Sequence, residues 1–183
     1  DYYEAYNRDN VTLVDVSNCG IECLTPTGLR AEGMDYNLNT IIYATGFDAM
    51  TGSVTRIKIT GSDGRTIQDK WADGPRNYLG LTIGGFPNLF MIHGPGSPGV
   101  FYNMPLGAER QMDWIGHCMR HLGEQELGAI EPTPGSEEAW GTEVSTLANA
   151  TLFPRTDSWW TGANVPGKPR YFSAYLGGSL YYY

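Results

Sequence analysis

The first third of the chain carries the apolar patterns of short strands. Residues 11–16 alternate between apolar and polar positions and are rich in β-branched side chains, which predicts a strand. Residues 21–25 predict a second strand, which Pro26-Thr27-Gly28 stops. Residues 28–31 and 36–38 are expected to complete a hairpin-like ribbon with it.

Two further patterns predict strands before the middle of the chain. Residues 40–44 are almost continuously apolar, which is typical of a strand buried on both faces, and Thr45-Gly46-Phe47-Asp48 gives a sharp exit from it. Residues 57–59 and 66–67 flank Gly61-Ser62-Asp63-Gly64, a strong signal for a hairpin turn.

The stretch from Gly84 to Pro105 is the one around which we expect the chain to be organised. Leu89-Phe90-Met91-Ile92 predicts a short buried strand, and the segment Gly94-Pro95-Gly96-Ser97-Pro98-Gly99 follows it. A helix is predicted over 106–122. A strand, a glycine-rich loop and a helix N-terminus let the backbone approach an anionic or heteroaromatic ligand.

The glycines of this loop have the spacing G-x-G-x-x-G, but we do not interpret them as a dinucleotide fingerprint. That motif requires a helix that starts within the glycines and an acidic residue about twenty positions later. Here two prolines interrupt the motif, and the predicted helix starts after it. A ligand-facing loop of another kind is the favoured interpretation, and a plain structural turn is the alternative.

Helical periodicity returns in the second half of the chain. Apolar residues at Met112, Ile115, Met119 and Leu122 predict one amphipathic helix. A second helix is predicted over 136–150, with Ser136 as its N-cap. From 151 to 183 no period holds, and an irregular segment of that length is usually functional or mobile.

Composition and charge exclude several classes of function. A net charge of −8 argues against binding to nucleic acid or anionic lipid, and no apolar run approaches 18 residues. No secretory leader opens the chain, and Asp1 with Tyr2–Tyr6 reads as the interior of a protein, so we expect an upstream segment. Three cysteines without a CxxC pair indicate a reduced, cytoplasmic protein.

Candidate chemistry is sparse in the rest of the sequence. His117 and His121 share a helical face and resemble half a zinc site, but no third ligand is apparent, so we favour a solvated face and expect no metal. His93 is either close to a ligand or a hydrogen-bonded core histidine. No G-x-S-x-G elbow supports a hydrolase. The indoles of Trp159 and Trp160 are either core residues or a clamp for a ribose or an aromatic ring.

Three passages together resemble the C-terminal third of the flavin-dependent Baeyer–Villiger monooxygenases. They are Ile41–Ala49, then Gly85–Pro98, then Ser158–Lys168, which contains Gly-Ala-Asn-Val-Pro-Gly-Lys. The longer loop at Pro98–Phe101 is similar to that of the phenylacetone and steroid monooxygenase branch. The family signature motifs and its catalytic arginine belong upstream of Asp1, so the resemblance implies no catalytic residue in this segment.

The fold that the resemblance implies is α/β, as the C-terminal portion of a flavoprotein with two Rossmann-like domains, one for FAD and one for NADP. Residues 1–43 would end the NADP-binding domain, and residues 44–53 would be the interdomain linker. Residues 54–183 would complete the FAD-binding domain and include a mobile loop at 154–170.

The resemblance also implies site residues. The FAD side would have Thr45, Gly46, Phe47, Asp48, Gly94, Pro95, Asn103 and Met104. The NADP side would have Trp159 and Lys168, with Trp159 holding the nicotinamide ribose. The ketone pocket would have Pro98, Gly99, Val100 and Phe101.

The activity implied is NADPH-dependent insertion of one oxygen atom of O2 next to a ketone carbonyl, which gives an ester or a lactone. The upstream part of the same protein is the expected partner, and the chain alone is expected to be inactive. Two alternatives remain open, namely a flavin monooxygenase that oxidises amines or sulfides, and a non-catalytic flavin-binding fragment.

Overall fold

The computed structural model describes residues 2–98, 102–178 and 182, and it divides into two compact units, residues 1–45 and 46–183. The division falls inside the linker predicted over 44–53. The assignment of the first unit to an NADP-binding domain stays a prediction.

The first unit contains the predicted ribbon. Helix α1 (Tyr2–Ala5) precedes the strands β1 (Ile21–Thr25), β2 (Gly28–Ala31) and β3 (Met34–Asn37), which form an antiparallel sheet in the order β1-β2-β3. A bulge between Ile21 and Cys23 shifts the β1–β2 register. This part of the sequence prediction is confirmed, because two tight turns set the pairing of three short strands.

Two strand predictions in this unit are wrong. Residues 11–16 and 40–44 form no strand, and no described residue pairs with either segment. Ile42 is 85% exposed, although its neighbours have the pattern of a strand covered on both faces. A strand needs a hydrogen-bonded neighbour, and the apolar pattern gives the preference without supplying that neighbour.

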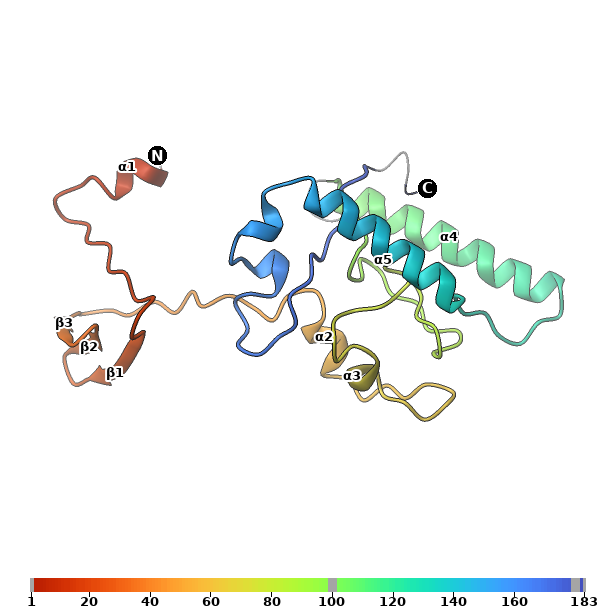
Figure 1. Cartoon of the computed structure of the whole chain (residues 1–183), viewed down its shortest axis with the longest axis horizontal. Coiled ribbons are helices and arrows are strands. Elements are labelled where there is room, and N and C mark those ends of the chain that lie inside the picture. Colours follow the sequence, from red (N-terminus) through yellow and green to blue (C-terminus); the bar gives the residue numbers. More distant parts are fainter. Residues whose placement is uncertain (1, 99–101, 179–181, 183) are drawn as a thin grey trace. The chain divides into compact units, whose positions relative to one another are not determined.

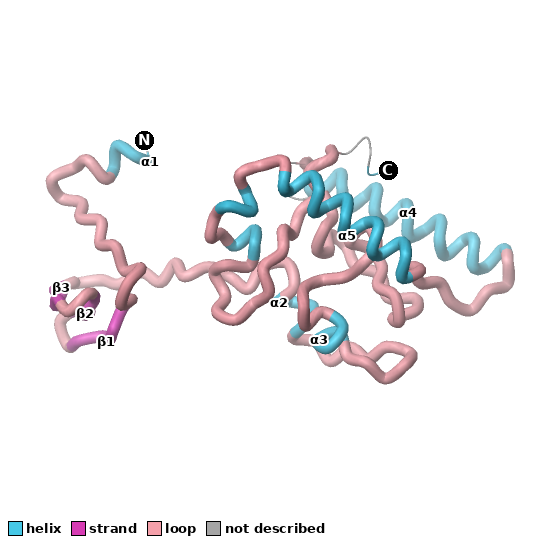
Figure 2. The backbone as a smooth tube through the Cα atoms, viewed as in Figure 1, coloured by secondary structure: helices cyan, strands magenta, loops and turns pink. Residues whose placement is uncertain are grey.

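The second unit is built mainly from loops and helices (Figures 1 and 2). Short helices α2 (Gly52–Thr55) and α3 (Ile67–Lys70) come first, and a capping box between Thr66 and Asp69 starts α3. A core cluster forms around α3 and the segment that follows it, from Ile67, Trp71, Ile83, Phe86 and Met91.

The strands predicted in this unit are reduced to single bridges. Thr60 pairs with Thr66 across the predicted turn at 61–64, but Ile67 begins α3 instead of continuing a strand. Phe90 pairs with Thr82, and the rest of 89–92 forms no ladder among the described residues.

Two long helices, α4 (Met104–Glu124) and α5 (Pro134–Asn149), follow, and their existence was correctly predicted (Figure 1). Asn103 caps α4 by accepting the N–H of Leu106. The N-cap of α5 is Thr133 and not Ser136, because the Thr133 hydroxyl accepts the N–H of Ser136. Pro134 is the first helical residue and favours this start, since the first turn needs no N–H at that position.

The buried face of α4 includes Ile115, as predicted, but otherwise differs from the predicted one. Gly107, Gln111 and Ile115 are buried, whereas Met112 and Met119 are exposed. His117 and His121 lie on the exposed part of the helix. None of the described helices is long and apolar enough to cross a membrane.

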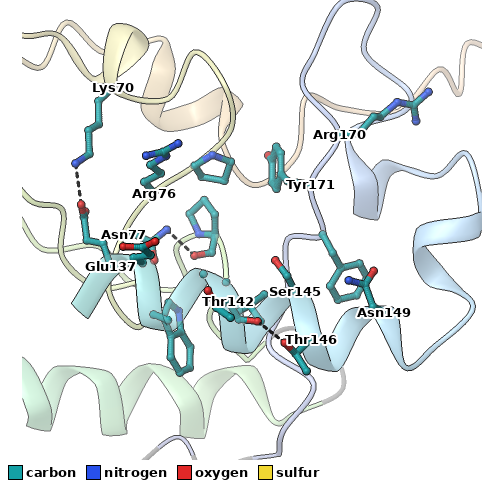
Figure 3. Close-up of a pocket in the computed structure, with 18 of the residues that line it drawn as sticks. Lys70, Arg76, Asn77, Glu137, Thr142, Ser145, Thr146, Asn149, Arg170 and Tyr171 are labelled. Carbon is teal, nitrogen blue, oxygen red and sulfur yellow. Dashed lines mark hydrogen bonds and ion pairs between the residues drawn. The ribbon is translucent and has the colours of Figure 1, made fainter. Parts of the chain in front are cut away.

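A buried ion pair ties α3 to α5. The Lys70 ammonium lies 2.7 Å from a carboxylate oxygen of Glu137, and the two side chains are 15% and 6% exposed (Figure 3). The other oxygen of Glu137 accepts the N–H of Gly84 at 2.8 Å. One carboxylate thus joins α5 to α3 and to the start of the stretch 84–105.

We expect Glu137→Gln in the complete protein to lower the free energy of unfolding by about 3–5 kcal/mol, because it leaves the Lys70 ammonium buried without its counter-charge. Glu138→Gln is the matched control, since Glu138 is the neighbouring residue on α5 and is exposed. Thermal and urea unfolding of both variants measure the effect. Equal, small changes in the two variants would contradict a structural role for the pair.

Candidate functional site

The glycine-rich loop is held from two sides by hydrogen bonds. The buried Asn77 amide donates to the Pro95 carbonyl at 2.9 Å, and its oxygen accepts the N–H of Gly80 at 2.7 Å. On the other side, Gly96 donates to the Ser173 carbonyl at 2.9 Å. The path of residues 94–98 is therefore fixed by contacts within this unit.

Gly80 and Gly94 are needed because their backbones approach each other closely. A β-carbon on Gly80 would lie 2.8 Å from the Gly94 carbonyl oxygen, and a β-carbon on Gly94 would overlap the Gly80 carbonyl oxygen. Gly80 also has φ +68°, which disfavours any other residue. The loop can occupy this position only with glycine at both places.

His93 connects the loop to the start of α4. Its backbone N–H donates to Gln111 Oε1 at 2.8 Å, and its ring Nε2 lies 3.0 Å from the Met104 carbonyl oxygen. A carbonyl only accepts, so this contact places the proton on Nε2. His93 is therefore hydrogen-bonded, as one of the two alternatives expects, whereas its buried Nδ1 has no partner among the described residues and its proximity to a ligand stays a prediction.

Gln111 completes this network from the buried face of α4. Its side chain is fully buried, and its amide donates to the Tyr182 hydroxyl at 3.3 Å, which in turn donates to the Leu79 carbonyl. These hydrogen bonds hold α4 in place against the glycine-rich loop.

Among the described residues, one donor at the N-terminus of α4 has no acceptor. Asn103 takes up the N–H groups of Leu106, through its side chain, and Gly107, through its carbonyl, and Pro105 has no N–H. No described residue accepts the N–H of Met104. A hydrogen-bond acceptor of a ligand in front of α4 could bind the Met104 N–H. The positive end of the helix dipole would make this hydrogen bond more favourable.

The linker residues lie against the segment 164–171. The Lys168 ammonium lies 2.5 Å from Asp48 Oδ1 and 3.1 Å from the Ala49 carbonyl oxygen. The Asn164 amide donates to the Phe47 carbonyl at 2.8 Å. Asp48 and Lys168, which were predicted for different cofactors, thus bind each other.

Trp159 lies at the exposed end of an aromatic stack. Its ring is stacked on that of Trp160, with 4.0 Å between the ring centres. Trp160 is in turn stacked on Phe172, with 6.0 Å between the ring centres. Trp159 is 41% exposed, whereas Trp160 is half-buried. Each of the two interpretations therefore fits one member of the pair. Trp160 is a packing residue, whereas Trp159 exposes a ring face.

A hollow of the second unit lies elsewhere. A cleft of about 770 Å³ is bounded by α5, by residues 75–77 and by residues 170–172, and Figure 3 shows Arg76, Ser145 and Tyr171 around it. Of the predicted site residues that the structure describes, only Pro95 lines it. A smaller pocket, of about 280 Å³, is lined by Asp48 and by residues 165–169.

The remaining predicted residues differ in burial and in what can be described of them. Gly99, Val100 and Phe101 lie outside the described residues, whereas Pro98 is buried and forms a bridge with Tyr175. Thr45 is exposed and ends the first unit. Phe47 is 87% exposed, and Gly46 beside it has φ +82°.

The sequence interpretation missed three residues that shape the site, namely Asn77, Gln111 and Tyr171. Gln111 is four positions after Gly107 and four before Ile115, so helical spacing could have placed it on the buried face. Asn77 and Tyr171 lie in irregular segments, where no periodicity gives a signal.

Relatives cover almost the whole chain. A Baeyer–Villiger monooxygenase from Pseudooceanicola batsensis is 42% identical over 179 residues, which is 97% of this chain and 32% of that protein. A phenazine N-monooxygenase from Lysobacter antibioticus is 40% identical over 97% of this chain and 33% of its own length. No protein-family model matches the chain.

Solved structures give the same result. Cyclohexanone monooxygenase from Rhodococcus sp. Phi1 bound to NADP+ has a TM-score of 0.87 at 45% identity, over 99% of this chain and 34% of that one. Oxidized steroid monooxygenase bound to NADP has a TM-score of 0.80 at 45% identity, with the same coverage. A complex of OTEMO with FAD and NADP has a TM-score of 0.85 at 39% identity, over 99% and 33%.

The fold and these relatives define the class as two-domain flavoproteins, and the α/β prediction is confirmed. Within that class the chain is related to the Baeyer–Villiger monooxygenases, which confirms the resemblance, and it spans about one third of the length of the curated relatives it matches. Cyclohexanone and steroid monooxygenases match at equal identity, so the branch stays a prediction.

We expect Gln111→Leu to reduce the stability of the complete protein by about 1–3 kcal/mol, because the His93 N–H loses its acceptor in a buried place. Met112→Leu on the exposed side of the same helix is the control. Urea unfolding measures both. A Gln111→Leu variant as stable as the control would show that the network does not hold α4 in place.

Proposed function

We propose that the complete protein containing this chain is an FAD- and NADPH-dependent Baeyer–Villiger monooxygenase. It inserts one oxygen atom of O2 next to a ketone carbonyl and releases an ester or a lactone. The observation that carries the proposal is about 40% identity to such enzymes over 97% of the chain. The chain spans about one third of their length, so the activity is that of the whole protein.

The FAD side is proposed at the glycine-rich loop and the start of α4. When bound, FAD supplies the chemistry that activates O2 for transfer. The fit rests on the N–H of Met104, which no described residue accepts and which could bind an acceptor of the cofactor. Gly94 and Pro95 fix how the cofactor can approach the Met104 N–H, because their backbone is held against Gly80 and Asn77.

The linker residues Thr45, Gly46, Phe47 and Asp48 belong to the same proposal on the strength of the resemblance. Gly46 supplies the left-handed backbone that a sharp exit needs. No catalytic residue is proposed within this segment, and no metal is proposed.

The NADP side is proposed at Trp159, with Lys168 on the same segment. The exposed indole of Trp159 is held by its stack on Trp160, which leaves one ring face and the N–H for a nucleotide. Pro98, Gly99, Val100 and Phe101 are proposed for the ketone pocket by resemblance. The proposed partners are a ketone, O2 and the upstream part of the protein, and the proposed localisation is cytoplasmic.

A second candidate is oxidation at nitrogen. It is favoured by the relative named phenazine N-monooxygenase, which is 40% identical over 97% of this chain. Such an enzyme would need the same two cofactors, so the residues described here are compatible with either product. The product of the reaction distinguishes oxidation of a ketone from oxidation at nitrogen.

The test uses the purified complete protein with FAD, NADPH and ¹⁸O₂, and it offers cyclohexanone and phenazine in separate reactions. We expect the ketone to give a lactone that contains one ¹⁸O atom, detected by mass spectrometry, with one NADPH consumed per product. An N-oxide from phenazine without any lactone would establish the second candidate. NADPH oxidation that yields only hydrogen peroxide with both substrates would contradict both.

We expect Trp159→Phe in the complete protein to weaken NADP binding roughly three- to tenfold, because it keeps the stacked ring and removes one hydrogen-bond donor. Bound flavin and melting temperature should stay unchanged, since the ring is at the exposed end of the stack. Titration calorimetry and the flavin absorbance measure the two effects. A lower melting temperature with unchanged NADP affinity would instead make Trp159 a packing residue.

A further inference from the structure

Four contacts fasten the segment 158–171 to residues 46–51. They are the ion pair of Lys168 with Asp48, the bond from Lys168 to the Ala49 carbonyl, the bond from Asn164 to the Phe47 carbonyl, and a 3.2 Å bond from the Tyr171 hydroxyl to Thr51. The partners are about 120 positions apart in the sequence, so the contacts close a long loop. We refer to them together as the linker latch.

Lys168 is the central member of the linker latch. Its side chain is 10% exposed, and its ammonium also donates to the Ala49 carbonyl and lies 5.7 Å from the Tyr171 ring centre. A buried ammonium with this set of partners is held in one place. The contrast on the same segment is the pair of Arg170 with Asp157, whose side chains are 55% and 89% exposed.

The stem of Lys168 extends the latch to Trp159. A β-carbon on Gly162 would lie 3.3 Å from Lys168 Cδ, so the stem packs directly on the backbone of Gly162. Gly162 has φ +73° and its N–H donates to the Trp159 carbonyl, which closes the turn η2 (Trp159–Thr161). The chain of contacts therefore runs from Asp48 through Lys168 and Gly162 to Trp159.

We propose that Lys168 is a positioning residue, which acts with Asp48 to hold the turn that carries Trp159 in place for the nicotinamide nucleotide. The inference rests on the proposed function, and it assigns to Lys168 a role through the turn instead of a direct contact with a phosphate. Two of the three N–H donors of the ammonium are already bound within the chain. The aliphatic stem of Lys168 supports the backbone of the turn.

The proposal predicts that Asp48 affects the position of the Trp159 turn, which it does not contact directly. Asp48 lies two residues after Gly46, whose left-handed backbone makes the bend in the linker. A displacement of the linker would move the Asp48 carboxylate, and the ion pair would transmit that displacement to the turn of Trp159. Linker and nucleotide-side turn thus form one mechanical unit within residues 46–171.

The test compares Lys168→Met, Asp48→Asn and the double variant in the complete protein. Lys168→Met keeps an unbranched apolar stem beside Gly162 and removes the ammonium with its bonds to Asp48 and Ala49. Hydrogen exchange of the peptide 158–168, measured without nucleotide, reports the latch itself. We expect each single variant to speed this exchange roughly ten- to a hundredfold, with no further gain in the double variant. Lys168→Arg should restore most of the protection, and Asp157→Asn is the matched exposed control.

The affinity for NADP separates positioning from direct contact. We expect Lys168→Met and Asp48→Asn to weaken it by similar factors, roughly two- to thirtyfold, and we expect flavin content to stay unchanged in Lys168→Met. A loss in Lys168→Met with no loss, or a gain, in Asp48→Asn would place Lys168 on the nucleotide and overturn the proposal. Unchanged exchange in either single variant would also overturn it. The exchange result does not depend on product formation, so failure of the proposed activity is recognised separately, by the absence of lactone.

Discussion

The close approach of Gly80 and Gly94 is the constraint on which the rest of the second unit depends. Neither position tolerates a β-carbon, and the Asn77 amide bridges the two segments with one donor and one acceptor. This approach sets the path of residues 94–98, and through His93 and Gln111 it sets the position of α4. The same contacts place the Met104 N–H at the start of α4, which no described residue accepts.

One backbone strip joins the proposed flavin side to the proposed nucleotide side. Ser173 accepts the N–H of Gly96, and its own N–H and hydroxyl both donate to the Trp160 carbonyl. The backbone N–H of Tyr175 donates to the Ser97 carbonyl. The glycine-rich loop and the turn of Trp159 are therefore connected through residues 173–175, and the linker latch fixes the same turn from its other side. These connections give a physical reason why a nucleotide site and a flavin site would respond to each other.

The sequence predicted what depends on local signals. The β-ribbon over 21–37 and the helices α4 and α5 were found, because turn residues, caps and helical spacing act within a few positions. Pro134 could also have corrected the N-cap of α5 from Ser136 to Thr133. The strands expected at 11–16 and 40–44 were wrong, because no described residue supplies the neighbour that a strand requires.

The arrangement of the site was less accessible to prediction. Asp48 and Lys168 were both chosen by resemblance, but their contact joins positions 120 residues apart and follows from no pattern in either segment. Asn77 was missed because its two buried bonds depend on the Gly80–Gly94 approach, which only the folded chain creates. Gly99–Phe101 lie outside the described residues, so their place in a ketone pocket stays a proposal.

The most direct measurement is a crystal structure of the complete protein with FAD and NADP bound. The account expects the Met104 N–H to face an acceptor of the flavin and the Trp159 indole N–H to reach the nicotinamide ribose. It also expects the Lys168 ammonium to remain on Asp48. A flavin that lies away from α4, or a Lys168 that has left Asp48 for a phosphate of NADP, would contradict it.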